Sequence, residues 1–209
     1  MLEQVFQEFF KLASPRKPVL IPEKHRVLGT SLTEVPSSMQ VAIFGLGCFW
    51  GAERRFWKTQ GVWSTAVGYL GGELEHPSYK EVCSTYTNHA EVVRVVFDPK
   101  HISYAQLLSL FWEMHDPTQG MRQGNDVGTQ YRSLIAATTP AQYEEAKKSQ
   151  GFYQALLLEA GKGKITTEIL SPGQPFYYAE SEHQQYLDQN PNGYCALKGT
   201  GIACDWNLK

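Results

Sequence analysis

The sequence lacks the features that mark several specialised protein classes. No stretch approaches the roughly 20 consecutive apolar residues that span a bilayer, so we expect no membrane partner. The net charge is −2, with 19 Lys and Arg against 21 Asp and Glu, so there is no basic field to hold nucleic acid. The first 15 residues carry Glu3 and Glu8, lack a continuous apolar run and are not Arg-rich, unlike a secretory or mitochondrial leader. We expect a cytoplasmic monomer.

Cysteine is also scarce in this chain. The four cysteines, at positions 48, 83, 195 and 204, are too few for a disulfide scaffold of 209 residues. In a chain without an export signal, thiols are kept reduced, and their usual roles are catalytic, redox-active or metal-binding. Aromatic residues, in contrast, are abundant at 12% of the chain. They fit a core, and they also supply rings for an apolar pocket.

The pattern along the chain predicts one catalytic domain with two irregular ends. Residues 1–40 read as a short amphipathic helix followed by a proline-punctuated extended arm that packs on the domain. Residues 41–209 form the domain, whose segment from about 188 to 209 is glycine-rich, flexible and carries two cysteines. Strand-like runs alternate with helical ones, and Ser103 and Thr139 are typical helix caps. The predicted fold class is α/β (an α+β two-layer sandwich), with a mixed sheet covered by helices. The strand-like runs cover 41–44, 62–69, 92–97, 132–137 and 165–170.

Cys48 is the first candidate for chemistry. It stands where a strand meets the start of a helix, between Gly47 and Gly51, which permit tight backbone turns. Unpaired backbone N–H groups and the helix dipole there favour an anion, so we expect a lowered thiol pKa and a nucleophilic thiolate. The adjacent Phe49 and Trp50 suggest an apolar cage for a group as small as a methyl. A buried structural cysteine is the alternative.

Residues 47–51, Gly-Cys-Phe-Trp-Gly, resemble the active-site motif of the peptide methionine sulfoxide reductase A (MsrA) family. Further segments resemble that family in the family's own order, and together they cover residues 41 to 204. Asn88 departs from the pattern, because many members have Gly there. The additional segments are residues 68–72, 76–79, 89–91, 115–117, 124–133, 182–187 and 190–195.

Glu91 is the candidate acid. It begins a run of valines, so its carboxyl is expected to lie against apolar surface, where desolvation raises a carboxyl pKa. A neutral carboxylic acid can donate a proton to a sulfoxide oxygen, which is otherwise a poor leaving group. A solvated strand-end Glu is the alternative, and the match to the family's His-Ala-Glu segment favours the catalytic interpretation.

The resemblance also implies a substrate-binding set. Tyr79 and Tyr131 resemble the two tyrosines that hydrogen-bond the sulfoxide oxygen, although either could be a core residue. Asp126 resembles a residue that holds the site through polar contacts, and it could equally be a turn residue. Phe49 and Trp50 complete the set as the methyl cage.

The resemblance implies that Cys48 becomes a sulfenic acid, that Cys195 then attacks it, and that Cys204 attacks Cys195. The remaining disulfide would be reduced by thioredoxin. A static disulfide or a zinc site formed by Cys195, Cys204 and His183 are the alternatives, and the zinc site lacks a CxxC and a clear fourth ligand. We predict neither a metal nor a cofactor.

The predicted function is reduction of methionine S-sulfoxide, free or in proteins. The S preference comes wholly from the resemblance. A thiol peroxidase is the closest rival, but it needs neither a methyl cage nor an acid at position 91. Cys83 is expected to be a buried, inert bystander, and His89, His115 and His183 to be structural hydrogen-bonders.

Overall fold

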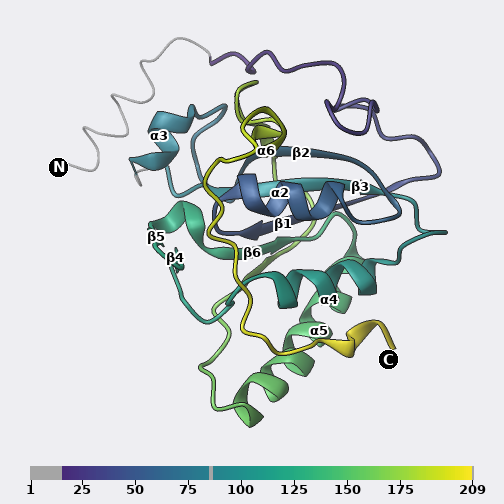
Figure 1. The fold of residues 1–209 in the computed structure, drawn as a ribbon, viewed down its shortest axis with the longest axis vertical. Coiled ribbons are helices and arrows are strands. Elements are labelled where there is room, and N and C mark those ends of the chain that lie inside the picture. Colours follow the sequence, from purple (N-terminus) through teal and green to yellow (C-terminus); the bar gives the residue numbers. More distant parts are fainter. Residues whose placement is uncertain (1–15, 85–86, 209) are drawn as a thin grey trace.

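The computed structural model describes residues 16–84 and 87–208, and its centre is a six-stranded sheet (Figure 1). The strand order is β7-β6-β1-β3-β2-β8. β6 and β7 pair in parallel and the other neighbours are antiparallel, so the predicted mixed sheet is confirmed. The predicted helix over residues 2–12 lies outside the described residues. The strands are β1 (Gln40–Leu46), β2 (Val62–Leu70), β3 (Ala90–Phe97), β6 (Ser133–Ala136), β7 (Glu168–Leu170) and β8 (Tyr177–Tyr178).

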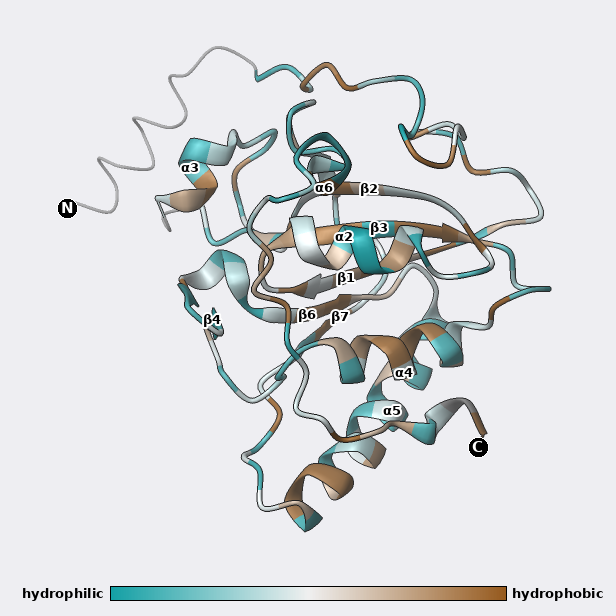
Figure 2. Cartoon of the chain, viewed as in Figure 1, coloured by the Kyte–Doolittle hydropathy of each residue, from teal (hydrophilic) through white to brown (hydrophobic). Residues whose placement is uncertain are grey.

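Helices cover one face of this sheet and hold the main core. In β1, Ala42, Phe44 and Leu46 belong to this core, whereas Ile43 belongs to a smaller cluster on the opposite face, as the two-residue period of a strand requires. β3, β6 and much of α4 are hydrophobic (brown in Figure 2). The helices are α2 (Phe49–Trp57), α3 (Tyr79–Cys83), α4 (Tyr104–Met114), α5 (Pro140–Glu159) and α6 (Tyr186–Gln189).

Four short elements complete the part of the fold that the structure describes. β4 (Arg122–Gln123) and β5 (Asp126–Val127) form a separate two-stranded hairpin, which leads into the 3-10 turn η1 (Thr129–Tyr131). A second 3-10 turn, η2 (Asp205–Leu208), packs on α4 and α5 near the end of the chain. Among the described residues no helix has the length and apolar character needed to cross a membrane.

The arm from residue 16 to residue 39 follows the surface of the domain in extended form (purple in Figure 1). Its contacts with the sheet are specific hydrogen bonds. The Thr30 hydroxyl donates to the Trp63 carbonyl at 2.7 Å, and the Ser64 hydroxyl donates to the Ser31 carbonyl at 2.9 Å. The arm therefore contacts the first part of β2, at Trp63 and Ser64, ahead of the residues that pair with β8.

Both predicted helix caps are confirmed. The Ser103 side chain accepts from the backbone N–H of Gln106 and forms a full capping box with it at the start of α4. The Thr139 side chain accepts from the Gln142 N–H, with Pro140 as the first residue of α5. Two elements were not predicted from the sequence: α3, which has its own capping box of Ser78 and Glu81, and the two-residue strand β8.

We predict that Ser103→Ala lowers the free energy of unfolding by about 1 kcal/mol, because the first turn of α4 loses its side-chain acceptor. Urea denaturation measures this change. Ser38→Ala is the matched control, since Ser38 is exposed and lies outside every helix. Equal midpoints for the two variants would contradict the capping role.

Candidate active site

Cys48 is the N-cap residue of α2, directly after β1. The turn that presents it requires glycine before it. Gly47 has a φ of 92°, and a Cβ there would lie 2.6 Å from the Gln123 Cβ. The Cys48 side chain makes no capping hydrogen bond at this helix start. The backbone N–H groups of Trp50 and Gly51 nevertheless act on the sulfur and lower its pKa, as the sequence predicted for the first turn of a helix.

The expected lowering of the Cys48 pKa is wrong for this structure. Burial raises the pKa of the Cys48 thiol well above its ordinary value, and the charge of Glu91 raises it further. The backbone N–H groups of Trp50 and Gly51 lower the pKa, but by less. The thiol therefore carries its proton at neutral pH, because desolvation disfavours the anion more than the helix terminus favours it.

Glu91, on β3, lies at the start of α2, where Cys48 also lies. Its Oε2 accepts a hydrogen bond from the Phe49 N–H at 2.9 Å, and the residue is 1% exposed. Burial, and to a smaller degree the charge of Asp126, raises the pKa of Glu91 to about 8. The predicted elevation is confirmed, so Glu91 is largely a neutral acid at pH 7 and does not raise the Cys48 pKa in that form.

An aromatic wall stands beside the thiol. The Trp50 ring stacks on Tyr186 with 3.8 Å between ring centroids, and its indole N–H donates to the Nδ1 of His183 at 3.2 Å. Phe49 is buried and packs against His183 and Tyr69. His183 is therefore a hydrogen-bonder, as expected, and it also joins Phe49 and Trp50 into one apolar surface.

Two tyrosines, Tyr79 and Tyr131, lie close to these residues. The Tyr79 ring packs on His183 with 4.4 Å between centroids. After burial, the charge of Glu91 is the largest cause that raises the pKa of Tyr131, and Glu91 also raises that of Tyr79. Both phenols therefore keep their protons at neutral pH and remain hydrogen-bond donors.

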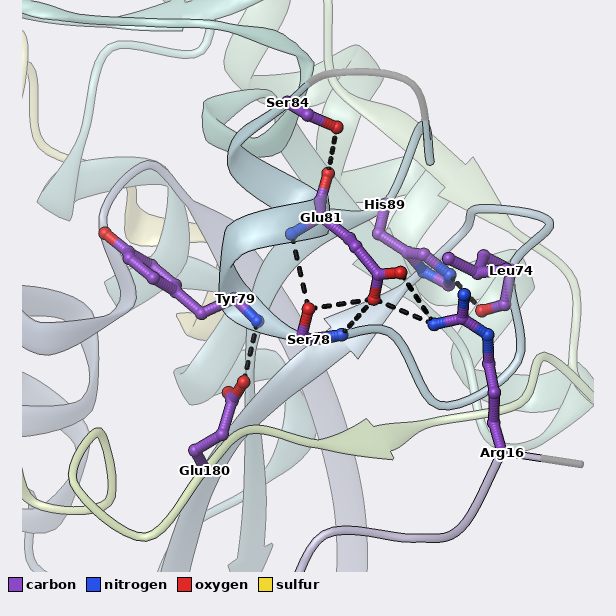
Figure 3. Close-up of polar contacts among 8 residues, drawn as sticks. All are labelled: Arg16, Leu74, Ser78, Tyr79, Glu81, Ser84, His89 and Glu180. Atoms are coloured by element: carbon purple, nitrogen blue, oxygen red, sulfur yellow. Dashed lines mark hydrogen bonds and ion pairs between the residues drawn. The ribbon is translucent and has the colours of Figure 1, made fainter. Parts of the chain in front are cut away.

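α3 is held in place by its own residue Glu81, which binds Arg16 of the arm, and by Glu180 (Figure 3). Arg16 donates to both oxygens of Glu81 at 2.8 Å, and Oε2 of Glu81 accepts from the backbone and hydroxyl of Ser78. The Tyr79 N–H donates to Glu180 at 2.7 Å. Tyr79, the first residue of this short helix, thus has its backbone fixed from two directions.

α6 is fixed by a buried acid that sequence reasoning did not single out. Glu53, in α2 and 0% exposed, accepts from the backbone N–H of Gln185 at 2.8 Å and from its side-chain amide at 2.7 Å. Thr65 also donates to Glu53, and Nε2 of His25 from the arm lies 2.9 Å from the Thr65 hydroxyl. Gln185 precedes Tyr186, so this network positions the ring that stacks on Trp50.

Cys195 lies over the first turn of the helix that Cys48 begins. The Cys195 thiol is exposed, and a Cβ on Gly51 would lie 2.8 Å from its sulfur. The preceding Tyr194 donates through its hydroxyl to Asp126 at 3.0 Å. Asp126 thus tethers the C-terminal segment through Tyr194, and its expected role in substrate binding stays a prediction.

A family model of the peptide methionine sulfoxide reductases matches residues 40–204. The chain belongs to this family. The peptide methionine sulfoxide reductase MsrA of Streptomyces griseus subsp. griseus is 59% identical over 186 residues, which cover 88% of this chain and 84% of that protein. The mitochondrial peptide methionine sulfoxide reductase of Homo sapiens is 58% identical over 190 residues, covering 90% and 80%. As a member, the chain is an oxidoreductase.

Solved structures of relatives share the fold. Methionine sulfoxide reductase A of Corynebacterium diphtheriae has a TM-score of 0.82 and 46% identity, covering 92% of this chain and 94% of its own. Mxr1 from Saccharomyces cerevisiae in complex with Trx2 has a TM-score of 0.52 and 25% identity, covering 80% and 93%. The MsrA resemblance and the fold class predicted from sequence are both confirmed.

Cys204 of this MsrA family member lies apart from Cys195 and is not exposed. Its thiol is 1% exposed within the main core, and its backbone N–H donates to the Glu113 side chain at 2.7 Å. Burial raises the pKa of the Cys204 thiol to about 11. The tail is irregular, as expected, but Cys204 is anchored on α4. A relay through it therefore requires this segment to move.

Cys83 is not the buried bystander that we expected. It is partly exposed and its sulfur forms a hydrogen bond with the Tyr79 hydroxyl, one turn earlier in α3. The sequence carried a signal for this contact, because Tyr79 and Cys83 are four positions apart on one helix.

The described residues hold no group of three or more His, Cys, Asp and Glu that could bind a metal ion. His89 and His115 make hydrogen bonds with backbone carbonyls, of Leu74 at 2.7 Å and of Phe111 at 2.8 Å. Their predicted structural role is confirmed. Asn88, the departure from the family pattern, has a φ of 54°, a left-handed conformation that Asn tolerates better than most residues.

We predict that stability falls between pH 5 and pH 8 partly through Glu91. The folded state holds the Glu91 proton up to about pH 8, whereas the unfolded chain releases it near 4.5, so rising pH favours unfolding. Glu91→Gln removes this contribution, on the order of 2–4 kcal/mol. Urea denaturation at pH 5 and pH 8 tests it: an equally steep fall in both proteins would contradict a buried neutral acid.

Proposed function

We propose that this chain reduces the S epimer of methionine sulfoxide, free and in oxidised proteins, with Cys48 as the nucleophile and thioredoxin as the reductant. One observation carries the proposal. The Cys48 thiol and the carboxyl of Glu91 both lie at the start of α2, beside the aromatic residues Phe49, Trp50 and Tyr186. Family membership supports the S preference, and the solved complex of yeast Mxr1 with Trx2 supports the thioredoxin partner.

In the first step the Cys48 sulfur attacks the sulfur of the sulfoxide while Glu91 supplies a proton to its oxygen. Phe49 and Trp50 hold the methyl group. The hydroxyl of Tyr131 donates to the oxygen as charge develops on it, and that of Tyr79 does so after it turns away from Cys83. Collapse releases methionine and leaves Cys48 as a sulfenic acid. The thiol proton returns to Glu91, so one thiol and one sulfoxide give one sulfenic acid and one thioether.

In the second step Cys195 attacks the sulfur of the sulfenic acid, and water leaves as the disulfide forms. The position of Cys195 over Gly51 supports this step, because it places the second thiol on the helix turn that presents the first. Cys204 then attacks Cys195 and frees Cys48, after its segment leaves α4. Thioredoxin reduces the resulting Cys195–Cys204 disulfide.

The site of action and the assembly state are further parts of the proposal. We propose a cytoplasmic monomer that binds neither membranes nor nucleic acid.

Thiol counting after one addition of pure methionine S-sulfoxide tests the pathway. The unmodified chain should lose two thiols per methionine formed, with Cys195 and Cys204 found linked. Cys48→Ser should form no methionine, because the nucleophile is gone. Cys204→Ser should form one equivalent of methionine but lose thioredoxin-driven turnover.

The R epimer serves as the control in the same assay. Turnover of the R epimer alone would contradict the stereochemical proposal. Full activity of Cys48→Ser would contradict the mechanism as a whole.

Glu91→Gln should slow the first step by roughly 10²–10⁴-fold, the usual contribution of a general acid. In the unmodified chain, the rate should fall as pH rises through about 8, where Glu91 loses the proton it must donate. The variant should lack this fall. Rapid-quench measurement of methionine formation between pH 6 and pH 10 decides the matter, and an unchanged rate in the variant would exclude Glu91 as the acid.

A further inference from the structure

We propose that a cavity beside Cys195 binds a small thiol that carries carboxylate groups, and that this thiol reduces the Cys48–Cys195 disulfide without Cys204. The inference rests on the proposed function, since it needs that disulfide. It adds a second class of reductant and a site for it.

The cavity has a volume of about 290 Å³. This is near the lower end of small-molecule sites, which span roughly 300–1,000 Å³, so it suits a molecule the size of a short peptide and not a protein loop. It opens between α2, α4 and the C-terminal segment. Its lining residues are Arg54, Arg55, Glu113, Met114, Cys195, Leu197 and Gly199.

The charges in the cavity favour an anion. Within residues 16–84 and 87–208, the guanidinium groups of Arg54 and Arg55 have no ion-pair partner. Glu113 is the one acid in the lining, and its side chain already accepts the Cys204 N–H. The lining therefore carries two positive charges, on Arg54 and Arg55, and one negative charge, on Glu113. This excess of positive charge favours a carboxylate ligand, which arginine binds with paired hydrogen bonds.

The dipole of α2 explains the position of Arg54 and Arg55 only in part. Arg54 and Arg55 stand in the last turn of α2, where cations interact favourably with the helix dipole. That interaction does not account for a cavity that also contains the exposed thiol. An anion held by these two side chains would lie next to the Cys195 sulfur.

The internal thiol does not share this cavity. Cys204 lines a second cavity of about 270 Å³, on the far side of Glu113. It is buried there, whereas Cys195 is exposed. An external thiol in the first cavity therefore reaches Cys195 without the rearrangement that Cys204 needs.

The chemistry requires two molecules of the external thiol. The first, as its thiolate, attacks Cys195 in the Cys48–Cys195 disulfide, and Cys48 leaves and takes up a proton. A mixed disulfide on Cys195 results. The second thiolate attacks the external sulfur of that bond, which releases the oxidised small disulfide and the Cys195 thiol. Two external thiols are oxidised and one protein disulfide is reduced.

The test compares three thiols of different charge as sole reductants: anionic glutathione, neutral 2-mercaptoethanol and cationic cysteamine. Turnover of methionine sulfoxide should saturate with glutathione in the unmodified chain and in Cys204→Ser. In the double variant Arg54→Gln/Arg55→Gln, kcat/KM for glutathione should fall at least about tenfold, as expected for a lost charged hydrogen bond. The value for 2-mercaptoethanol should stay unchanged, and that for cysteamine should rise.

Lys147→Gln/Lys148→Gln is the matched control, because it removes two neighbouring positive charges from the exposed face of α5. It should leave all three values unchanged. Thermal unfolding of both double variants shows whether either has lost its fold.

Three results would overturn the proposal. They are an equal loss with all three thiols, a glutathione rate that rises linearly like that of 2-mercaptoethanol, and a loss confined to thioredoxin-driven turnover, which would assign the surface to a protein partner. Single-turnover methionine formation is measured first in each protein. If the unmodified chain fails there, the proposed function fails; if only the glutathione step fails, this inference alone does.

Discussion

The hydrogen bond from the Phe49 N–H to the carboxyl of Glu91 is the contact on which the site depends. It joins the first turn of α2 to the middle of the sheet at 2.9 Å, in a place from which water is excluded. The same burial that raises the pKa of Glu91 keeps the Cys48 thiol protonated. Both side chains are therefore neutral at rest, and in the proposed reaction charge separates only once a substrate is bound.

Two layers of support surround that contact, and the arm takes part in both. On one side Arg16 fixes Glu81 and through it the start of α3 and Tyr79. On the other side, His25 reaches Glu53 through Thr65, and Glu53 fixes the turn before Tyr186. Burial lowers the pKa of His25 to about 4, so this ring is neutral and the buried network that it joins carries no positive charge. Because the family model starts at residue 40, these supports come from a segment that lies before the matched region.

The three thiols of the proposed reaction occupy different environments. Cys48 lies at the start of α2, Cys195 is exposed over Gly51, and Cys204 is buried on α4. The segment that carries Cys204 packs tightly on α4, since a Cβ on Gly199 would overlap the carbonyl of Glu113. In the proposed pathway the first disulfide would therefore form locally, and the second would require the tail to leave its place on α4.

The sequence by itself determined the periodic strands, the caps at Ser103 and Thr139, the glycine turn before Cys48 and the burial of Glu91, because each depends on neighbours close in the chain. It did not determine the pKa of Cys48, because burial by distant elements raises this pKa more than the local helix terminus lowers it. Nor could it place Glu53 against Gln185 or Cys204 on Glu113, since these partners are 132 and 91 residues apart. Only the tertiary structure decided them: a hydrogen bond between remote segments exists when the packing of the whole core brings donor and acceptor together.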